Sequence, residues 1–190
     1  MQIYVVDDQE GRYFRRTQVG LRFLAHGART QTVCQWTKLT PEQVGRHRRR
    51  FGFKARDRLR GPSPSSFEFC FSSRRARNQA ALFLCICRIV GVQPPRGDEP
   101  NLDIQSLIVN GERFCSAFEI FNDWEPQANL EIEQAVLLVT GVAQGLEIGL
   151  EECEECSTLF LIDKLLPSRN GCPACRKSRS ASAETPQITS

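Results

Sequence analysis

Histidine is scarce in this 190-residue chain, which contains only His26 and His47. Few side chains are therefore available for catalysis by a Cys–His pair, and we expect each histidine to have a structural or surface role. The sequence also lacks paired carboxylates in a recognisable setting, a phosphate-binding loop and a nucleophile motif. These absences predict a protein that binds other molecules and performs no chemistry on a substrate.

Long hydrophobic runs are missing as well. The longest, Ala80 to Val90, contains Arg88 and is too short to span a bilayer as a helix. Residues 1–8 show neither the basic segment nor the long apolar segment of a signal peptide. We therefore expect a cytoplasmic protein with no membrane anchor.

Cysteine, by contrast, is abundant, with nine residues in the chain. Disulfides are rare in the cytoplasm, where thiols are kept reduced. We expect five of the nine to be reduced thiols that pack as small hydrophobic side chains. These five are Cys34, Cys70, Cys85, Cys87 and Cys115.

The other four cysteines form two C-x-x-C pairs separated by 15 residues, which is the spacing of a zinc site. Four thiolates complete a tetrahedron and leave no open position for a zinc-activated water. A strand at residues 158–162 and a turn at 168–171 complete a zinc-ribbon pattern. We predict one structural Zn²⁺ per chain, while bound iron and a redox dithiol remain alternatives. The predicted ligands are Cys153, Cys156, Cys172 and Cys175.

Apolar residues recur at helical spacing along most of the chain, so the predicted fold is mainly α with a C-terminal four-cysteine zinc ribbon. Thr40 and Pro41 form a sharp helix start, and Gly91 a helix end. The expected helices cover residues 13–26, 28–37, 41–51 and 74–90, a stripe from Phe114 to Trp124, and a stripe from Ile132 to Leu150. The expected regions are a basic helical DNA-binding region (1–60), a helical core and partner-binding region (67–150), the zinc ribbon (151–176) and a disordered tail (177–190).

Charge is divided along the chain. Residues 1–96 carry 19 Lys and Arg against 6 Asp and Glu, whereas residues 97–163 carry 1 against 15. A basic half of this kind suggests an anionic partner on one face. The acidic segment is either a solvated helical surface or a site for a basic partner.

Residues 28–51 fit a helix-turn-helix pattern. Its apolar positions would lock two short helices together, and the second helix would expose Gln43, Arg46, Arg49 and Arg50, with His47 and Arg48 toward its edge. Arginine and glutamine read guanine and adenine edges in the major groove, and the basic residues that follow suit phosphate contacts. A solvated basic face explains the same arginines about as well. The candidate phosphate contacts are Lys54, Arg56, Arg58 and Arg60.

The order of these elements resembles the FlhC family, the zinc-binding subunits of the flagellar master transcription activator of proteobacteria. The residues that carry the resemblance are Leu24 to Gln31 with its Gly-Ala-Arg-x-Gln stretch, the capped basic helix after Leu39, the Gly61 to Pro64 loop, the helix from Asn78 to Gly91, and both cysteine pairs. The resemblance covers most of the chain.

The resemblance implies a hetero-oligomer with a small helical FlhD-like subunit, which binds double-stranded promoter DNA of flagellar operons and recruits RNA polymerase. It carries the metal ligands onto the four cysteines above, and DNA contacts onto Arg29 and the helix from Glu42 to Arg50. We also expect the aromatic residues at Phe114, Phe118, Phe121 and Trp124 to contribute to assembly. The alternative function is a zinc-ribbon adaptor that binds other proteins without reading DNA sequence.

Overall fold

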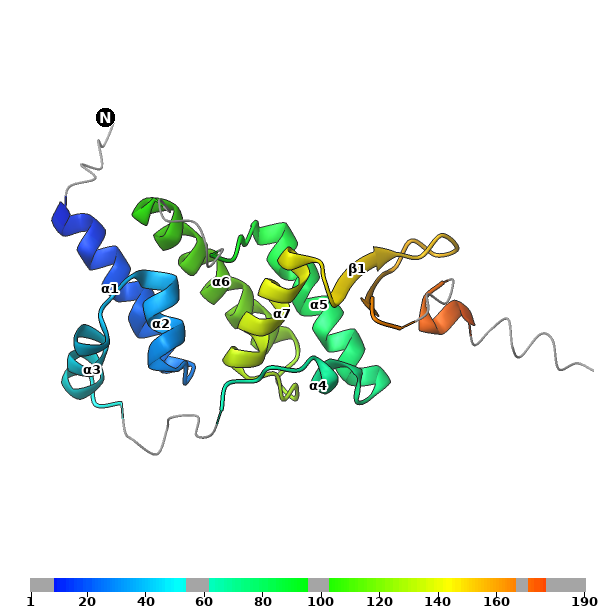
Figure 1. The fold of residues 1–190 in the computed structure, drawn as a ribbon, viewed down its shortest axis with the longest axis horizontal. Helices are drawn as coiled ribbons and strands as arrows, with labels where there is room; N and C mark the ends of the chain where they lie inside the picture. Colours follow the sequence, from blue (N-terminus) through cyan, green and yellow to red (C-terminus); the bar gives the residue numbers. More distant parts are fainter. Residues whose placement is uncertain (1–8, 54–61, 96–102, 167–170, 177–190) are drawn as a thin grey trace, which may run out of the picture.

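A computed structural model describes residues 9–53, 62–95, 103–166 and 171–176 of the chain. The described residues are mainly helical, as predicted, and a small antiparallel hairpin follows the helices (Figure 1). The elements are α1 (Gln9–Ala25), α2 (Thr30–Thr37), α3 (Pro41–Arg50), α4 (Glu68–Phe71), α5 (Arg74–Val90), α6 (Ile104–Trp124), α7 (Ile132–Gln144), β1 (Ile148–Glu152) and β2 (Leu159–Asp163).

Local capping signals position two of these helices as the sequence predicts. At α3, the Thr40 hydroxyl accepts from the Gln43 N–H and the Gln43 side chain accepts from the Thr40 N–H, which forms a capping box ahead of Pro41. Helix α5 begins after Ser73, whose side chain accepts from the Ala76 N–H, and ends at Gly91 with a left-handed φ of 77°.

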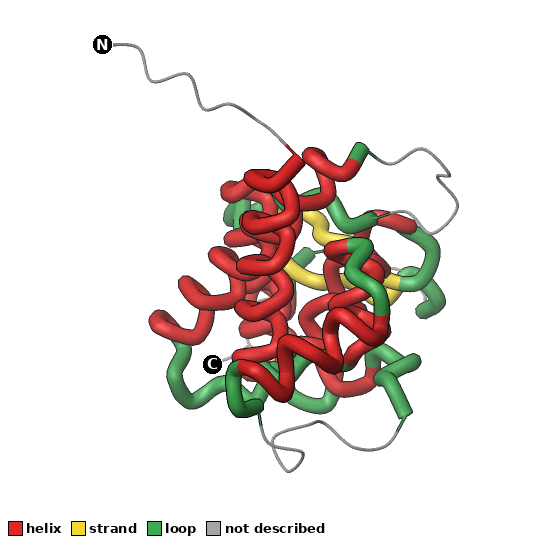
Figure 2. The backbone as a smooth tube through the Cα atoms, turned by 90° about the vertical axis from the view of Figure 1, so that its left-hand side faces the viewer, coloured by secondary structure: helices red, strands yellow, loops and turns green. Residues whose placement is uncertain are grey.

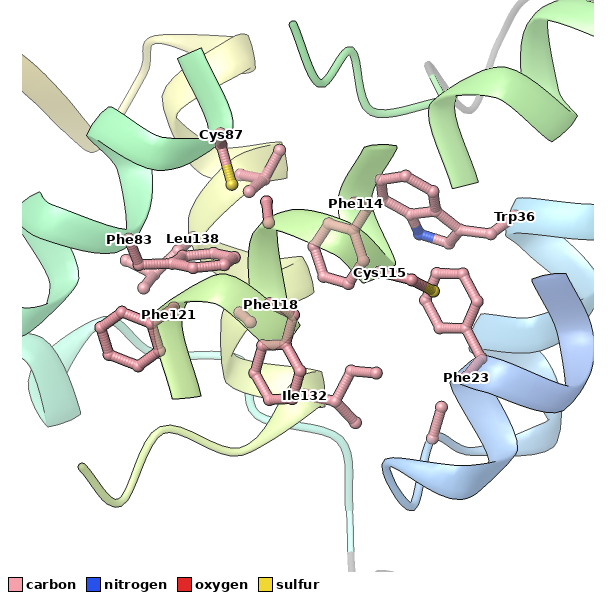
Figure 3. Packing of buried hydrophobic residues seen from close by; sticks show 14 of the residues in the cluster. Phe23, Trp36, Phe83, Cys87, Phe114, Cys115, Phe118, Phe121, Ile132 and Leu138 are labelled. Atoms are coloured by element: carbon pink, nitrogen blue, oxygen red, sulfur yellow. The ribbon is translucent and has the colours of Figure 1, made fainter. Parts of the chain in front are cut away.

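Aromatic packing joins α1, α2, α5 and α6 around one core (Figure 3). Phe114 of α6 stacks on Phe23 of α1, with ring centroids 5.4 Å apart, and lies 4.7 Å from the buried Trp36 of α2. From the other side, Phe83 of α5 contacts Phe114, Phe118 and Phe121. The core is therefore shared between the two regions that the sequence analysis separates near residue 60.

Phe114, Phe118 and Phe121 are part of this core, with at most 4% of each residue exposed. The expectation that they contribute to assembly is therefore wrong for these three residues in this structure. Trp124 alone of the group is exposed, at 67%. The three rings are buried because α6 packs against α1, α2 and α5 and lies between them in Figure 1. Figure 2 shows that most of the described chain is helical.

Two ion pairs connect α1 to α6, so some charges of the basic half and of the acidic segment neutralise each other within the chain. Arg15 pairs with Glu112 at 2.8 Å, and Arg22 pairs with Glu119 at 2.6 Å. Burial alone would raise the pKa of Glu119, but hydrogen bonds from Arg22 and His26 outweigh burial and lower it. These two acids of residues 97–163 therefore pair with basic residues of the same chain. Part of the acidic segment thus has a structural role within the fold.

The structure corrects the predicted helix boundaries at one place that matters for the site. Helix α7 ends at Gln144, where Gly145 takes a left-handed φ of 68°, so the predicted stripe does not continue as a helix to Leu150. Leu146 is 75% exposed, and Leu150 lies in β1. Within the described ranges, no helix combines the length and apolar character needed to cross a membrane.

Candidate metal centre and basic helix

The first cysteine pair lies in the loop of the β1–β2 hairpin. The strands pair from Ile148 opposite Asp163 to Glu152 opposite Leu159, so Cys153 follows directly on the last residue pair. The Cys153 N–H donates to the Thr158 carbonyl (3.0 Å), and the Ser157 N–H donates to the Cys153 carbonyl (2.8 Å). Ser157 has a left-handed φ of 54°, which closes the loop tightly. These bonds hold the first pair as a rigid knuckle.

The second pair approaches the first from the end of the chain. Gly171 has a left-handed φ of 82°, and residues 173–176 form a single helical turn in which the Arg176 N–H donates to the Cys172 carbonyl (3.1 Å). The predicted strand is present as β2, whereas residues 168–170 of the predicted turn lie outside the described residues.

The four thiol sulfurs lie within 4.8 Å of one another and can hold a metal ion. Zinc–sulfur bonds of about 2.3 Å in a tetrahedron would separate the sulfurs by about 3.8 Å. The sulfurs of Cys156 and Cys172 are 3.7 Å apart, which matches that separation. Cys153 and Cys172 are buried, while Cys156 is exposed at the surface of the knuckle.

Backbone N–H groups already point at two of the sulfurs. The Cys172 N–H donates to the Cys153 sulfur (3.3 Å), and the Cys175 N–H donates to the Cys172 sulfur (3.5 Å). The first of these bonds contributes most to a pKa of about 7 for Cys153, well below the ordinary thiol value. Sharing hydrogen bonds with Cys156 and Cys172 raises the pKa of Cys175 to about 12. A metal ion would displace the remaining thiol protons and bind four thiolates. The backbone N–H groups that donate to two of these sulfurs are already in place around the site.

A corner between α1 and α2 contains the Gly-Ala-Arg-x-Gln stretch. Glu133 of α7 is only 5% exposed, and its carboxylate accepts from the Arg29 N–H and from the Thr32 hydroxyl, both at 2.8 Å. The guanidinium of Arg48 donates to the carbonyl of the buried Ala28 at 2.6 Å. These contacts join α1, α2, α3 and α7 at one point, so the stretch has a structural role of its own.

The predicted DNA contacts divide into three groups. Arg46, Arg49 and Arg50 are exposed on α3. Gln43 is half-buried and forms the capping box, while Lys54 and Arg58 lie outside the described residues, as do Arg56 and Arg60. The remaining two, Arg29 and Arg48, point toward other parts of the chain.

Arg48 is 5% exposed and bonds to Ala28, so its side chain is not on the exposed face of α3. The guanidinium of Arg29 donates to the Pro62 carbonyl (2.9 Å) and lies 3.9 Å from the Glu133 carboxylate. The structure therefore gives both residues a packing role that the sequence analysis did not assign. His47 is also buried, and burial, followed by repulsion from Arg46 and Arg50, lowers its pKa.

Glu133 has a structural role that its position in the sequence does not predict. In the sequence it looks like an ordinary acid in the first turn of a helix, where the helix dipole favours negative charge. Its partner Arg29 lies 104 positions away along the chain. Only the tertiary fold, which brings the start of α7 beside the start of α2, places the two side by side.

No protein-family model matches the chain, and no curated protein matches it. The resemblance to the FlhC family therefore stays a prediction that rests on the motifs themselves.

Proposed function

We propose that this chain is the zinc-binding, DNA-binding subunit of a transcription activator of the FlhC type. In this proposal it assembles in the cytoplasm with a small helical FlhD-like subunit, binds promoter DNA of flagellar operons and recruits RNA polymerase. It performs no chemistry on a substrate. The observation that carries the proposal is the exposed arginine face of α3.

Helix α3 is suited to insertion in a DNA groove because one side is anchored and the other is basic. Val44 is fully buried, and Arg48 bonds to the preceding corner, which fixes the rotation of the helix. Arg46, Arg49 and Arg50 remain exposed to reach bases or phosphates. A three-residue turn that contains a left-handed Lys38 separates α3 from α2, which is the short connection that a helix-turn-helix needs.

Zinc is the metal that the donor set favours. Four cysteine sulfurs within 4.8 Å of one another, one pair of them 3.7 Å apart, suit a closed structural zinc site, which offers no open position for catalysis. The ion would hold together a hairpin and a helical turn that have little hydrophobic core of their own. Iron bound by the same four sulfurs is the chemical alternative.

The proposal is tested by fluorescence titration of the assembled two-subunit complex against a flagellar promoter duplex and a scrambled duplex at several salt concentrations. If Arg46 or Arg49 reads a guanine, its replacement by Ala should weaken binding to the promoter by about 1–3 kcal/mol and relax discrimination at one base pair. Lys54→Ala or Arg58→Ala should weaken binding to both duplexes and flatten the salt dependence by about one unit.

Arg12→Ala is the matched control, because Arg12 is an exposed arginine on α1. It should leave the affinity for both duplexes near that of the wild-type complex. Equal losses on both duplexes for the Arg46 and Arg49 variants would mean that α3 does not read sequence. If the wild-type complex forms but binds neither duplex, the protein-binding adaptor becomes the better description.

A further inference from the structure

An apolar groove opens between α5, α7 and β1, and its lining includes none of the four clustered cysteines and no residue of α3. Its cavity volume is about 450 Å³, and aliphatic side chains line most of it. Leu84 comes from α5, Val139 and Val142 from α7, and Leu150 from β1, while Val92 follows the end of α5. The groove belongs to neither site described above.

Exposed aliphatic residues lie in and beside this groove. Ala143 of α7 lines the groove and is exposed. Leu146 is 75% exposed and follows Gly145, whose carbonyl accepts from the side chain of the lining residue Lys164 at 2.8 Å. Apolar surface thus extends beyond the groove itself, and extended patches of this kind on a folded chain mark interaction surfaces.

The charged lining residues indicate the chemistry of the occupant. Arg88 and Lys164 contribute two cations, and Glu151 contributes one acid. Helix α5 contains no acidic residue of its own to neutralise Arg88. An occupant with acidic residues beside its apolar side chains would complement this rim, because opposite charges favour the correct partner and orientation.

The walls of the groove favour a helical occupant. Two of them are the neighbouring helices α5 and α7, and a third helix can pack its row of apolar side chains into the furrow between such a pair. Such an occupant would present aliphatic residues three or four positions apart, with acidic residues along its edge.

We propose that this groove is the docking site for an amphipathic helix of the partner subunit, with its aliphatic side chains in the groove and its acidic edge facing Arg88 and Lys164. This inference rests on the helical partner in the proposed function and assigns that partner a surface. It also gives the metal centre a role in assembly. Leu150 and Glu151 lie two or three residues before Cys153, so the cysteine cluster anchors one wall of the groove.

The test is a binding titration between the full chain and the FlhD-like subunit of the same cell. Ala143→Asp puts a charge on the apolar lining of the groove, and Arg88→Glu reverses the cationic rim. Both residues are exposed, so these variants should fold. Each should weaken the complex by at least about tenfold, as replacement of a central interface residue does.

Phe14→Asp and Arg12→Glu are the matched controls on α1, where Phe14 is 63% exposed and Arg12 is exposed. They should leave the affinity within about twofold of the wild-type value, as exposed positions outside an interface do. Hydrogen exchange on the wild-type complex should show new protection at residues 84–92 and 139–150. This second measurement does not depend on any variant.

Three outcomes would overturn the inference, and each is distinct. A complex that forms normally with both groove variants would leave the partner in place but remove the groove as its site. A wild-type chain that fails to bind the FlhD-like subunit would remove the partner, and the proposed function would fail with it. If the free chain is instead a dimer that Ala143→Asp dissociates, the occupant is a second copy of this chain.

Discussion

Glu133 shows how much of the fold can depend on one buried side chain. Its carboxylate accepts two hydrogen bonds from the start of α2 and lies near the Arg29 guanidinium. A buried acid is tolerated only when it is hydrogen-bonded and paired in this way. Glu133 therefore fixes the corner from which α2 and α3 extend, at a distance from the exposed arginines of α3.

We predict that Glu133→Ala lowers the free energy of unfolding by about 1–3 kcal/mol, because it leaves the partly buried Arg29 N–H and the buried Thr32 hydroxyl without the carboxylate they donate to. Glu133→Gln should cost less, since its amide oxygen can still accept from the Arg29 N–H. The measurement is urea denaturation at neutral pH. Glu42→Ala removes an exposed first-turn acid of α3 and serves as the control. If Glu133→Ala costs no more than that control, the buried carboxylate does not stabilise the corner.

At the scale of elements, the crossing of α1 and α6 depends on a glycine. A Cβ atom added at Gly111 would lie 2.6 Å from the Cγ1 atom of Val19, which is too close for real atoms. The two helices can therefore approach closely only because Gly111 has no side chain. The Arg15–Glu112 and Arg22–Glu119 ion pairs bridge the same two helices.

Gly111→Ala should therefore destabilise the chain by about 1–3 kcal/mol, since overpacking outweighs the better helix propensity of alanine. Gly45→Ala is the matched control within α3, where the added Cβ meets only the flexible end of Arg49 at 3.7 Å. That variant should gain up to about 1 kcal/mol. Thermal or urea unfolding measures both. A Val19→Ala substitution in the Gly111→Ala background should cost less than its effect in the wild-type chain, and strict additivity would refute the clash.

The elements themselves differ in how far the sequence predicts them. Helix α3 begins at Thr40-Pro41 and α5 ends at Gly91, as these strong local signals predict, and both predictions are confirmed. Ser73, which caps the start of α5, was not predicted. Strand β1 was assigned to a helix because Leu146 and Leu150 continue the helical spacing of α7 by coincidence. Short apolar runs cannot be divided between helix and strand by periodicity alone. The left-handed Gly145 is the signal that could have placed the boundary.

The two candidate sites also differ in how far the sequence predicts them. The spacing of the two C-x-x-C pairs predicts the proximity of the four sulfurs because each pair is a local structure, and the structure brings all four together. The exposed face of α3 could be predicted only in part. Arg48 lies between Arg46 and Arg49 in the run of basic residues, and only its contact with Ala28 separates it from that face.

On the scale of the whole molecule, α3 and the cysteine cluster lie at opposite ends of the elongated fold (Figure 1). The tip of the hairpin that carries the first cysteine pair exposes Glu151, Glu152, Glu154 and Glu155, whereas α3 exposes arginines. If the protein binds DNA as proposed, these acids would be repelled by DNA and the arginines attracted to it. This polarity would orient the chain with α3 toward DNA and the groove and metal centre toward other proteins.

The same separation predicts that metal loss acts on one end of the molecule. The tip of the hairpin and the turn at residues 171–176 meet at the cysteine cluster, whereas Ile148 and Leu161 anchor the strands in the helical core. Structural zinc in such sites supplies on the order of 10 kcal/mol of apparent binding energy. Freshly purified, reduced protein should contain one zinc per chain by elemental analysis. After chelation, hydrogen exchange should accelerate in residues 152–159 and 171–176, while α1, α2 and α6 keep their protection because their aromatic core lies elsewhere.

Two cysteine variants complete this test. Cys153→Ser removes a ligand position and should lose the metal, whereas Cys85→Ser, at a half-buried cysteine of α5 outside the cluster, should keep one zinc per chain. The Cys153 variant should also bind the partner subunit more weakly, because β1 forms one wall of the groove. Uniform acceleration of exchange along the whole chain after chelation would show that the metal stabilises the entire fold, and protein purified without any bound metal would refute the zinc site itself.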